Sequence, residues 1–179
     1  ARRGLPIANL QRFEPWYVGL VVGLVEMQAL GLSPEHGLDK HFAARATEAG
    51  KAVEGLERAE EQIALFDGLD PALQRQSLEE TLLEVEELES RTGKMHALWR
   101  AGDGEALFAM TGAEMKAEYP ALYERINTAR NLAWLPRVKA MLDAQAEDDA
   151  LVVVGALHLL GDEGLVELLE AEGYPVERL

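Results

Sequence analysis

The stretch ALVVVGALHLLG, residues 150–161, decides the fold that the sequence predicts. Its apolar, β-branched run ends at Gly155, and His158 follows three positions later. A short apolar run of this kind is typical of a buried strand. The next residues, 161–173, predict a helix that ends at Gly173, and residues 174–179 predict a final strand. These three elements form a βαβ unit, for which we expect parallel strands and a right-handed crossover.

Upstream of this unit the pattern is mostly helical. Residues 51–57 predict a short strand that ends at Glu57. Helices are expected over residues 15–30, 40–49, 58–66, 71–91 and 120–146, with a further helical piece between Gly93 and Gly102. The predicted helix stops are Gly31 and Gly50, and the predicted starts are Asp39 and Asp70 with Pro71. A kink is expected at Pro136. We therefore expect a single helix-dominated α/β domain over residues 1–179, with several long helices and a small parallel sheet of two to three strands.

Composition excludes several classes of function. The chain of 179 residues has a net charge of −15, which argues against nucleic-acid binding. It has no cysteine, so thiolate metal sites and cysteine nucleophiles are excluded. No signal peptide is visible after Arg2 and Arg3. The apolar residues 16–32 are short for a membrane span and include Glu26 and Gln28, so we expect a buried helix there.

His158 and Glu57 are the candidate chemical groups in this predicted fold. Glu57 ends one predicted strand and His158 follows another, and ligands gather beyond the carboxyl ends of parallel strands. An imidazole and a carboxylate can bind a divalent metal ion, or act as a base and the group that orients it. A catalytic zinc site needs about three protein ligands, so these two are not sufficient. The residues alone leave simpler alternatives open: His158 as a polar residue at a strand end, Glu57 as a helix cap, and Arg130 as a surface residue or a paired residue.

Three blocks of the chain together resemble the TraB/PrgY/GumN family. They are GLDKHFAARATEAGKAVEGLERAEEQIALFDGL, then ARNLAWLPRVKAML, then LVVVGALHLLGDEGLVELLEAEGYPVERL, in that order. The resemblance implies a relation to the Tiki metalloproteases, and a more distant one to erythromycin esterases and ChaN-like haem-binding proteins. It implies a site built from two G-x-x-H motifs with Glu and Arg. The matching residues here are Asp39, Glu57, Glu61, Gln62, Arg130, Asn131, Gly155 and His158.

The family's first G-x-x-H motif has no counterpart before Pro15, so the chain resembles the C-terminal portion of a TraB/GumN-type domain. On this resemblance we expect a metal-dependent hydrolase that acts on a peptide or ester-like bond. Its catalytic residues would be Glu57, Arg130 and His158, and its metal ligands His158 and Glu57. The expected partner is a peptide or small-molecule substrate, and the expected compartment is the bacterial periplasm or cell envelope.

Two other functions fit the same sequence. The first is a non-catalytic module that binds a peptide signal in a groove around Trp16, Trp99 and Trp134. The second is a protein that binds haem or a metal ion without chemistry. A homo-oligomer is also expected, formed either through the exposed edge of an incomplete sheet or through exchange of the first long helix.

Overall fold

The protein is described from a computed structural model that covers residues 7–84, 87–144 and 149–179. The chain divides into two compact units. Unit 1 comprises Ala1–Val53 and Arg58–Lys94, and unit 2 comprises Glu54–Glu57 and Met95–Leu179. The single domain expected from the sequence stays a prediction, because a compact unit is not by itself an independently folding domain.

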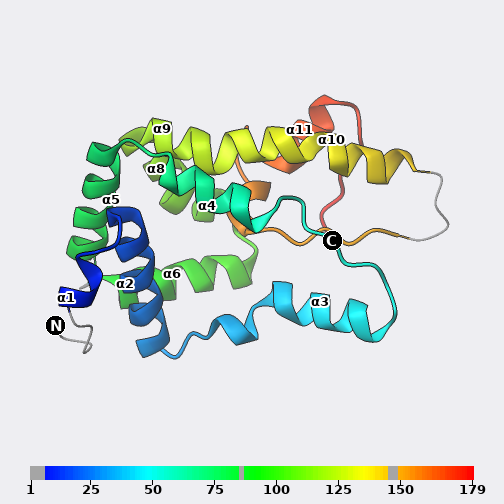
Figure 1. The fold of residues 1–179 in the computed structure, drawn as a ribbon. Helices are drawn as coiled ribbons and strands as arrows, with labels where there is room; N and C mark the ends of the chain where they lie inside the picture. Colours follow the sequence, from blue (N-terminus) through cyan, green and yellow to red (C-terminus); the bar gives the residue numbers. More distant parts are fainter. Residues whose placement is uncertain (1–6, 85–86, 145–148) are drawn as a thin grey trace. The chain divides into compact units, whose positions relative to one another are not determined.

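Unit 1 is built around two neighbouring helices, α2 and α5 (Figure 1). Gly19 of α2 lies against Thr81 and Leu78 of α5, and its missing side chain lets the two backbones come close. The Trp16 ring stacks on Phe66 of α4 with centroids 5.6 Å apart. The helical elements of this unit are α1 (Ile7–Leu10), α2 (Pro15–Ala29), η1 (Pro34–His36), α3 (Leu38–Glu48), α4 (Ala59–Asp67) and α5 (Pro71–Glu84).

Most of the predicted helix signals in unit 1 are confirmed. Pro15 opens α2, and Gly31 and Gly50 end α2 and α3 with φ values of +83° and +70°. The Asp70 carboxylate accepts a hydrogen bond of 2.7 Å from the Ala72 N–H at the start of α5. The predicted N-cap at Asp39 is wrong, because α3 begins at Leu38 after Gly37, which places Asp39 in the first turn.

Unit 2 is organised by one long helical run formed by α9, η3 and α10 (Figure 1). The buried face of this run carries Tyr123, Asn127, Asn131, Trp134, Leu135 and Val138. Pro136 lies inside α10, so the proline does not end the helix. The bounds are α6 (Leu88–Ala101, shared with unit 1), α7 (Gly104–Phe108), π-helical η2 (Ala109–Ala113), α8 (Glu114–Glu118), α9 (Pro120–Tyr123), π-helical η3 (Glu124–Thr128), α10 (Ala129–Asp143), η4 (Ala156–Leu159) and α11 (Leu165–Ala171).

Two further boundaries differ from the prediction. Gly93 lies inside α6 rather than before it, since α6 begins at Leu88. The helix predicted over 120–146 ends at Asp143, and residues 145–146 lie outside the described part of the chain. The stop at Gly173 is confirmed by its φ of +89°.

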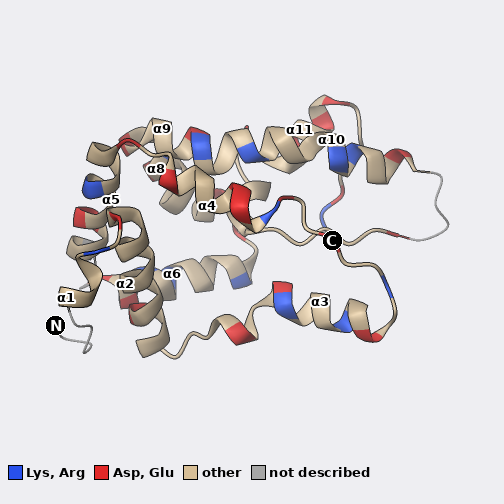
Figure 2. Ribbon diagram, viewed as in Figure 1, with Lys and Arg blue, Asp and Glu red and all other residues tan. Residues whose placement is uncertain are grey.

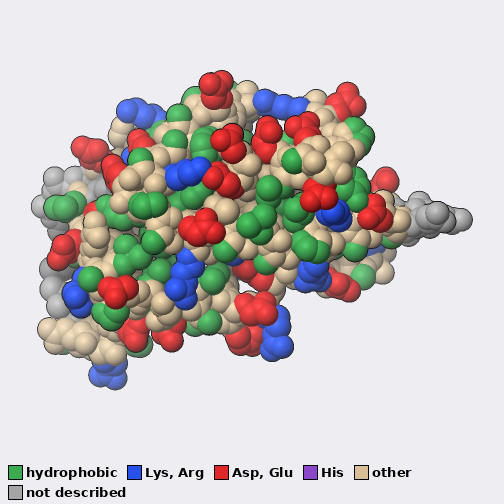
Figure 3. All heavy atoms as spheres, turned by 90° about the horizontal axis from the view of Figure 1, so that it is seen from above, with side chains coloured by type: hydrophobic (Ala, Val, Ile, Leu, Met, Phe, Trp, Pro, Cys, Tyr) green, Lys and Arg blue, Asp and Glu red, His purple; other side chains and the backbone are tan. Residues whose placement is uncertain are grey.

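The acidic side chains are scattered among basic and apolar ones over the surface seen in Figure 3.

The predicted parallel sheet and βαβ unit are wrong. In the described residues 7–84, 87–144 and 149–179 there is no strand, and the fold is helical. The described parts of the three predicted strands, at 51–57, 149–155 and 174–179, are irregular segments. Leu151 and Val153 are 70% and 40% exposed, which a buried central strand would not allow.

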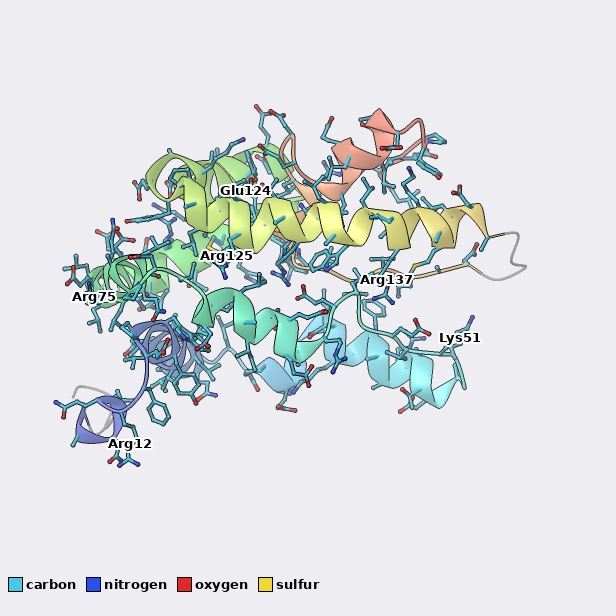
Figure 4. All side chains as sticks on the ribbon, turned by 45° about the horizontal axis from the view of Figure 1, so that its top comes forward. Arg12, Lys51, Arg75, Glu124, Arg125 and Arg137 are labelled. Atoms are coloured by element: carbon cyan, nitrogen blue, oxygen red, sulfur yellow. The ribbon has the colours of Figure 1, made fainter. Side chains whose placement is uncertain are left out.

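A side chain takes the place of a neighbouring strand at residues 54–57. Arg137 of α10 donates from Nη1 to the carbonyl oxygens of Gly55 and Leu56, at 2.8 and 2.9 Å. Figure 4 shows Arg137 directed from α10 toward this segment. A backbone carbonyl oxygen needs a hydrogen-bond donor, and the Nη1 group of Arg137 supplies one to each of these two oxygens without a neighbouring strand. The segment is therefore held on a helix rather than in a sheet.

No helix in the described ranges has both the length and the apolar character needed to cross a membrane.

Candidate functional site

The candidate site centres on Arg130, which lies near the start of α10 and is about four-fifths buried. Its guanidinium makes two hydrogen bonds to the Glu57 carboxylate, from Nε at 3.1 Å and from Nη2 at 2.5 Å. Two parallel bonds of this kind fix the orientation of a guanidinium. The structure therefore brings Glu57 and Arg130 together as a salt bridge.

The turn before α10 gives Arg130 a third fixed contact. Its Nη1 donates to the carbonyl oxygen of Ile126 at 3.0 Å, inside the π-helical turn η3. π-helical turns widen a helix and often occur at functional sites. The guanidinium also lies over the Trp134 ring, with Cζ 4.7 Å from the ring centroid. This distance is within the range of a cation–π interaction, which adds to the binding of the charge.

His158 completes the cluster from a second segment of unit 2, the one that follows α10 in the sequence. It lies on the short 3₁₀ helix η4, and its Nε2 is 3.2 Å from Arg130 Nη1. Its Nδ1 is 2.7 Å from the Asn131 side-chain oxygen. The Trp134 ring packs on the imidazole with centroids 4.6 Å apart. Sequence reasoning placed His158 beyond a strand, whereas the structure places it on a helical turn.

These contacts select one tautomer of His158. The Asn131 amide nitrogen donates to the Glu163 carbonyl at 2.7 Å, so the amide oxygen faces the imidazole. An oxygen acceptor at 2.7 Å requires the proton on Nδ1. Nε2 therefore carries the free electron pair, and it accepts from Arg130 Nη1. A neutral imidazole with an unprotonated Nε2 is the form that can act as a base or bind a metal ion.

Close packing at two glycines positions the loop that carries His158. Gly161 has a φ of +74° and lies directly against the Phe108 ring. Gly112, in the π-helical turn η2, lies against Phe108 and Leu157. A side chain at either glycine would collide with the ring. The Phe108 ring thus packs between η2 and the loop that follows η4.

The electrostatics of the cluster keep His158 neutral. Burial, and next the positive charge of Arg130, lower the pKa of His158 from 6.5 to about 4, and the Glu57 charge opposes this change. Because folding lowers this pKa, the unfolded chain binds a proton between about pH 4 and 6.5 that the folded chain does not bind. The stabilisation is complete above pH 6.5 and is lost as the pH falls toward 4.

We expect this linkage to be measurable as a pH-dependent free energy of unfolding. Between pH 7 and pH 4.5 the free energy of unfolding should fall by about 2 kcal/mol more in the wild-type chain than in the His158→Asn variant, because only the wild type has this imidazole to protonate. Water partly screens the half-buried ring, which limits the size of the difference. Urea unfolding of both chains at the two pH values measures the difference. Equal losses in both chains would show that His158 keeps its ordinary pKa in the folded protein.

The described residues do not form a complete metal site. No three His, Asp or Glu side chains in the described ranges lie close enough to hold an ion. The two predicted ligands, His158 and Glu57, are separated by the Arg130 guanidinium, which donates to both. A cation would have to displace this guanidinium and would need a further ligand. The donor set present here therefore does not fit a metal ion.

The other residues carried over from the family resemblance have different surroundings. Glu61 caps α4, because its carboxylate accepts from the Arg58 N–H at 2.8 Å. Asp39 and Gln62 are surface residues, and both belong with Glu61 to unit 1. Of the three tryptophans expected to line a groove, Trp16 lies in unit 1, whereas Trp99 and Trp134 lie in unit 2. Trp99 is 50% exposed and Trp134 is 5% exposed, so these two do not form a common exposed surface.

Of the three other residues of the cluster, Asn131 belongs to the block that resembles the family and Trp134 to the expected groove, whereas Arg137 is absent from the sequence prediction. Asn131 sets the His158 tautomer, Trp134 covers both His158 and Arg130, and Arg137 holds the backbone beside Glu57. A signal for the last two exists in the sequence. Residues 130, 134 and 137 follow the spacing of one helix face, so an arginine at 130 predicts that 134 and 137 share its surroundings.

Comparison with known proteins agrees with the resemblance noted in the sequence. The chain is 29% identical to the uncharacterized protein YbaP of Escherichia coli, over 86% of the chain and 55% of that protein, and equally to YbaP of Shigella flexneri. It is 24% identical to the metalloprotease TIKI2 of Danio rerio, over 94% of the chain and 37% of that protein. The chain thus spans about half the length of the YbaP proteins. No solved structure matches it.

A sequence profile of the TraB/PrgY/gumN family matches residues 1–178, which is nearly the whole chain. The residues of the cluster, Glu57, Arg130, Asn131 and His158, all lie within the matched range. The chain therefore belongs to the TraB/PrgY/gumN family.

Proposed function

We propose that unit 2 carries part of a hydrolytic site that acts on the carbonyl of a peptide or ester-like bond. The observation that carries this proposal is the contact between the unprotonated Nε2 of His158 and Nη1 of Arg130, at 3.2 Å. It places a base beside a fixed positive charge. Membership of the family, and the similarity to a protein named as a metalloprotease, support hydrolysis as the class of reaction.

Each residue of the cluster has a proposed role. A carbonyl group and a water molecule would enter between Arg130 and His158 and replace their direct contact. His158 Nε2 would take a proton from the water, whose oxygen attacks the carbonyl carbon, and would pass the proton to the leaving group. Arg130 would stabilise the negative charge that develops on the carbonyl oxygen. Glu57 would hold Arg130 in place through its two hydrogen bonds.

The metal dependence expected from the family resemblance stays a prediction. In the described residues, the two candidate ligands His158 and Glu57 are held apart by Arg130, and a catalytic zinc ion needs about three protein ligands. The proposed roles therefore involve only the side chains of this chain.

Binding without turnover is a second candidate function, and one observation favours it. All three nitrogen atoms of the Arg130 guanidinium make hydrogen bonds, to Glu57, Ile126 and His158, so its positive charge is held in one place. A peptide carboxylate could share the guanidinium through one of these positions without any reaction. In that case a peptide would bind at this site, and no hydrolysis would follow.

Substitution of Arg130 by lysine tests the proposal, with the longest natural protein that contains this chain. We expect kcat/KM for fluorogenic peptides or p-nitrophenyl esters to fall about 100-fold, because lysine keeps the charge and loses the fork geometry. The assay is run with and without added Zn²⁺ and with a chelator. Peptide binding without any hydrolysis, measured by calorimetry, would favour the second candidate. Hydrolysis that is unchanged in Arg130→Lys would contradict the role of Arg130.

A further inference from the structure

Helix α2 is apolar around its whole circumference, and its neighbours in unit 1 cover only one side of it. Glu26 is its one charged residue, and Figure 2 shows the helix almost free of charged positions. The covered side includes Gly19, which packs on α5, and Trp16, which stacks on Phe66. A surface helix normally has a polar face toward water, and α2 lacks one.

Another side of α2 carries a line of exposed apolar side chains, which we call the α2 stripe. It consists of Tyr17, Leu20, Leu24 and Met27, which are 40%, 52%, 45% and 41% exposed. Their spacing of three, four and three residues is the heptad pattern of a helix that packs against another helix. Phe13 extends the apolar surface at one end, since its ring lies 4.9 Å from that of Tyr17.

We infer that the α2 stripe binds the α2 stripe of a second copy of this chain, as an antiparallel pair of helices. The stripe is self-complementary in this arrangement. Tyr17 of one copy lies opposite Met27 of the other, and Leu20 lies opposite Leu24. The two-fold axis repeats both pairs, so four pairs of side chains stack along the two helices. Methionine sulfur packs favourably against aromatic rings, and antiparallel helices place opposite ends of their dipoles side by side.

The size and chemistry of the stripe favour a second copy over other occupants. The stripe and Phe13 expose roughly 500 Å² per chain, so these side chains would bury at most about 1,000 Å² in a pair, the lower limit for a specific interface. Gly23 beside the stripe has open space where a side chain would be, which allows a partner helix to approach closely. The net charge of −15 disfavours binding to anionic lipid. The stripe is narrow, has no charged residue and follows spacings of three, four and three residues. It therefore fits a single partner helix that has the same pattern.

The first experiment measures the oligomeric state of the 179-residue chain by light scattering. At about 100 µM we expect the mass of a dimer, which dissociates on dilution as small interfaces do. The double variant Leu20→Glu/Leu24→Glu should be a monomer with an unchanged circular dichroism spectrum, because both side chains are exposed. The matched control is Leu142→Glu, a 55% exposed leucine of α10 in unit 2, which should stay dimeric. A wild-type chain that is monomeric at this concentration overturns the proposal.

The second experiment tests the antiparallel pairing by cross-linking, which is simple because the chain has no cysteine. One chain carries Leu20→Cys and another carries Leu24→Cys. Under mild oxidation the mixture should form disulfide-linked dimers several-fold more than either chain alone, because residue 20 lies opposite residue 24. Strong cross-linking of each chain with itself would indicate a parallel pair and would overturn the arrangement. Absence of any cross-link would overturn the interface.

Discussion

Replacement of His158 by alanine is expected to lower kcat/KM by about 100- to 10,000-fold in the longest natural protein that contains this chain, the range for loss of a general base. The physical reason is specific to this site. The Nε2 atom of His158 is unprotonated because Asn131 holds the proton on Nδ1, and it lies 3.2 Å from the Arg130 guanidinium. No other described histidine contacts Arg130.

His158→Asn is the matched control for this experiment. Its amide nitrogen can still donate to Asn131, in place of Nδ1, but it has no basic nitrogen in place of Nε2. If His158 acts as a base, the asparagine variant should be as inactive as the alanine variant while it retains more of the stability. The pH profile of the wild type should lose activity as the pH falls toward about 4, the pKa of His158. Activity that survives both substitutions would leave His158 with a structural role alone.

Replacement of Asn131 by leucine is expected to lower the free energy of unfolding by about 3 kcal/mol. Asn131 is fully buried, and its amide satisfies two partners, the Glu163 carbonyl oxygen and the Nδ1–H of His158, each at 2.7 Å. Leucine has a similar volume but leaves both partners buried without a hydrogen bond. Each such loss costs about 1–3 kcal/mol, and urea unfolding at pH 7 measures the sum.

Two further variants make the Asn131 result specific. Leu132→Ala changes the next residue of α10, which is 50% exposed, and should cost about 0.5 kcal/mol. Asn131→Asp should keep the acceptor for His158 and lose the donor for Glu163, so its loss of stability should lie between the other two. Its negative charge should also raise the pKa of His158. A loss below about 1 kcal/mol in Asn131→Leu would mean that its partners find other hydrogen bonds.

Much of the helical structure follows from local signals in the sequence. Asp70 with Pro71 opens α5, and Gly31, Gly50 and Gly173 end helices with positive φ values, all as predicted. These signals work because a cap or a left-handed glycine acts within one turn of the chain. Boundaries that depend on packing were harder to predict. Gly93 is a predicted boundary, yet it lies inside α6, because a single glycine lowers helix propensity by only about 1 kcal/mol and the rest of the helix can compensate.

The sheet was the main error, and its cause is physical. Apolar, β-branched runs such as 151–154 show that a segment is extended or buried, but the pattern does not identify the partner of its backbone. At residues 54–57 that partner is the Arg137 side chain, which is 82 residues away from Gly55 in sequence. The prediction assumed that a neighbouring strand satisfies these carbonyl groups, and the structure satisfies them with a guanidinium group.

The sequence by itself determined the family, and it named Glu57, Arg130 and His158 as candidate site residues. The blocks around Glu57, Arg130 and His158 occur in family order, and the family match covers residues 1–178. The tertiary structure alone decided how these residues act on one another. It placed Arg130 between Glu57 and His158, assigned the proton of His158 to Nδ1 through Asn131, and left the α2 stripe exposed. Residue types are local properties of the chain, whereas tautomers, ion pairs and exposure depend on groups that are distant in sequence and meet only in the fold.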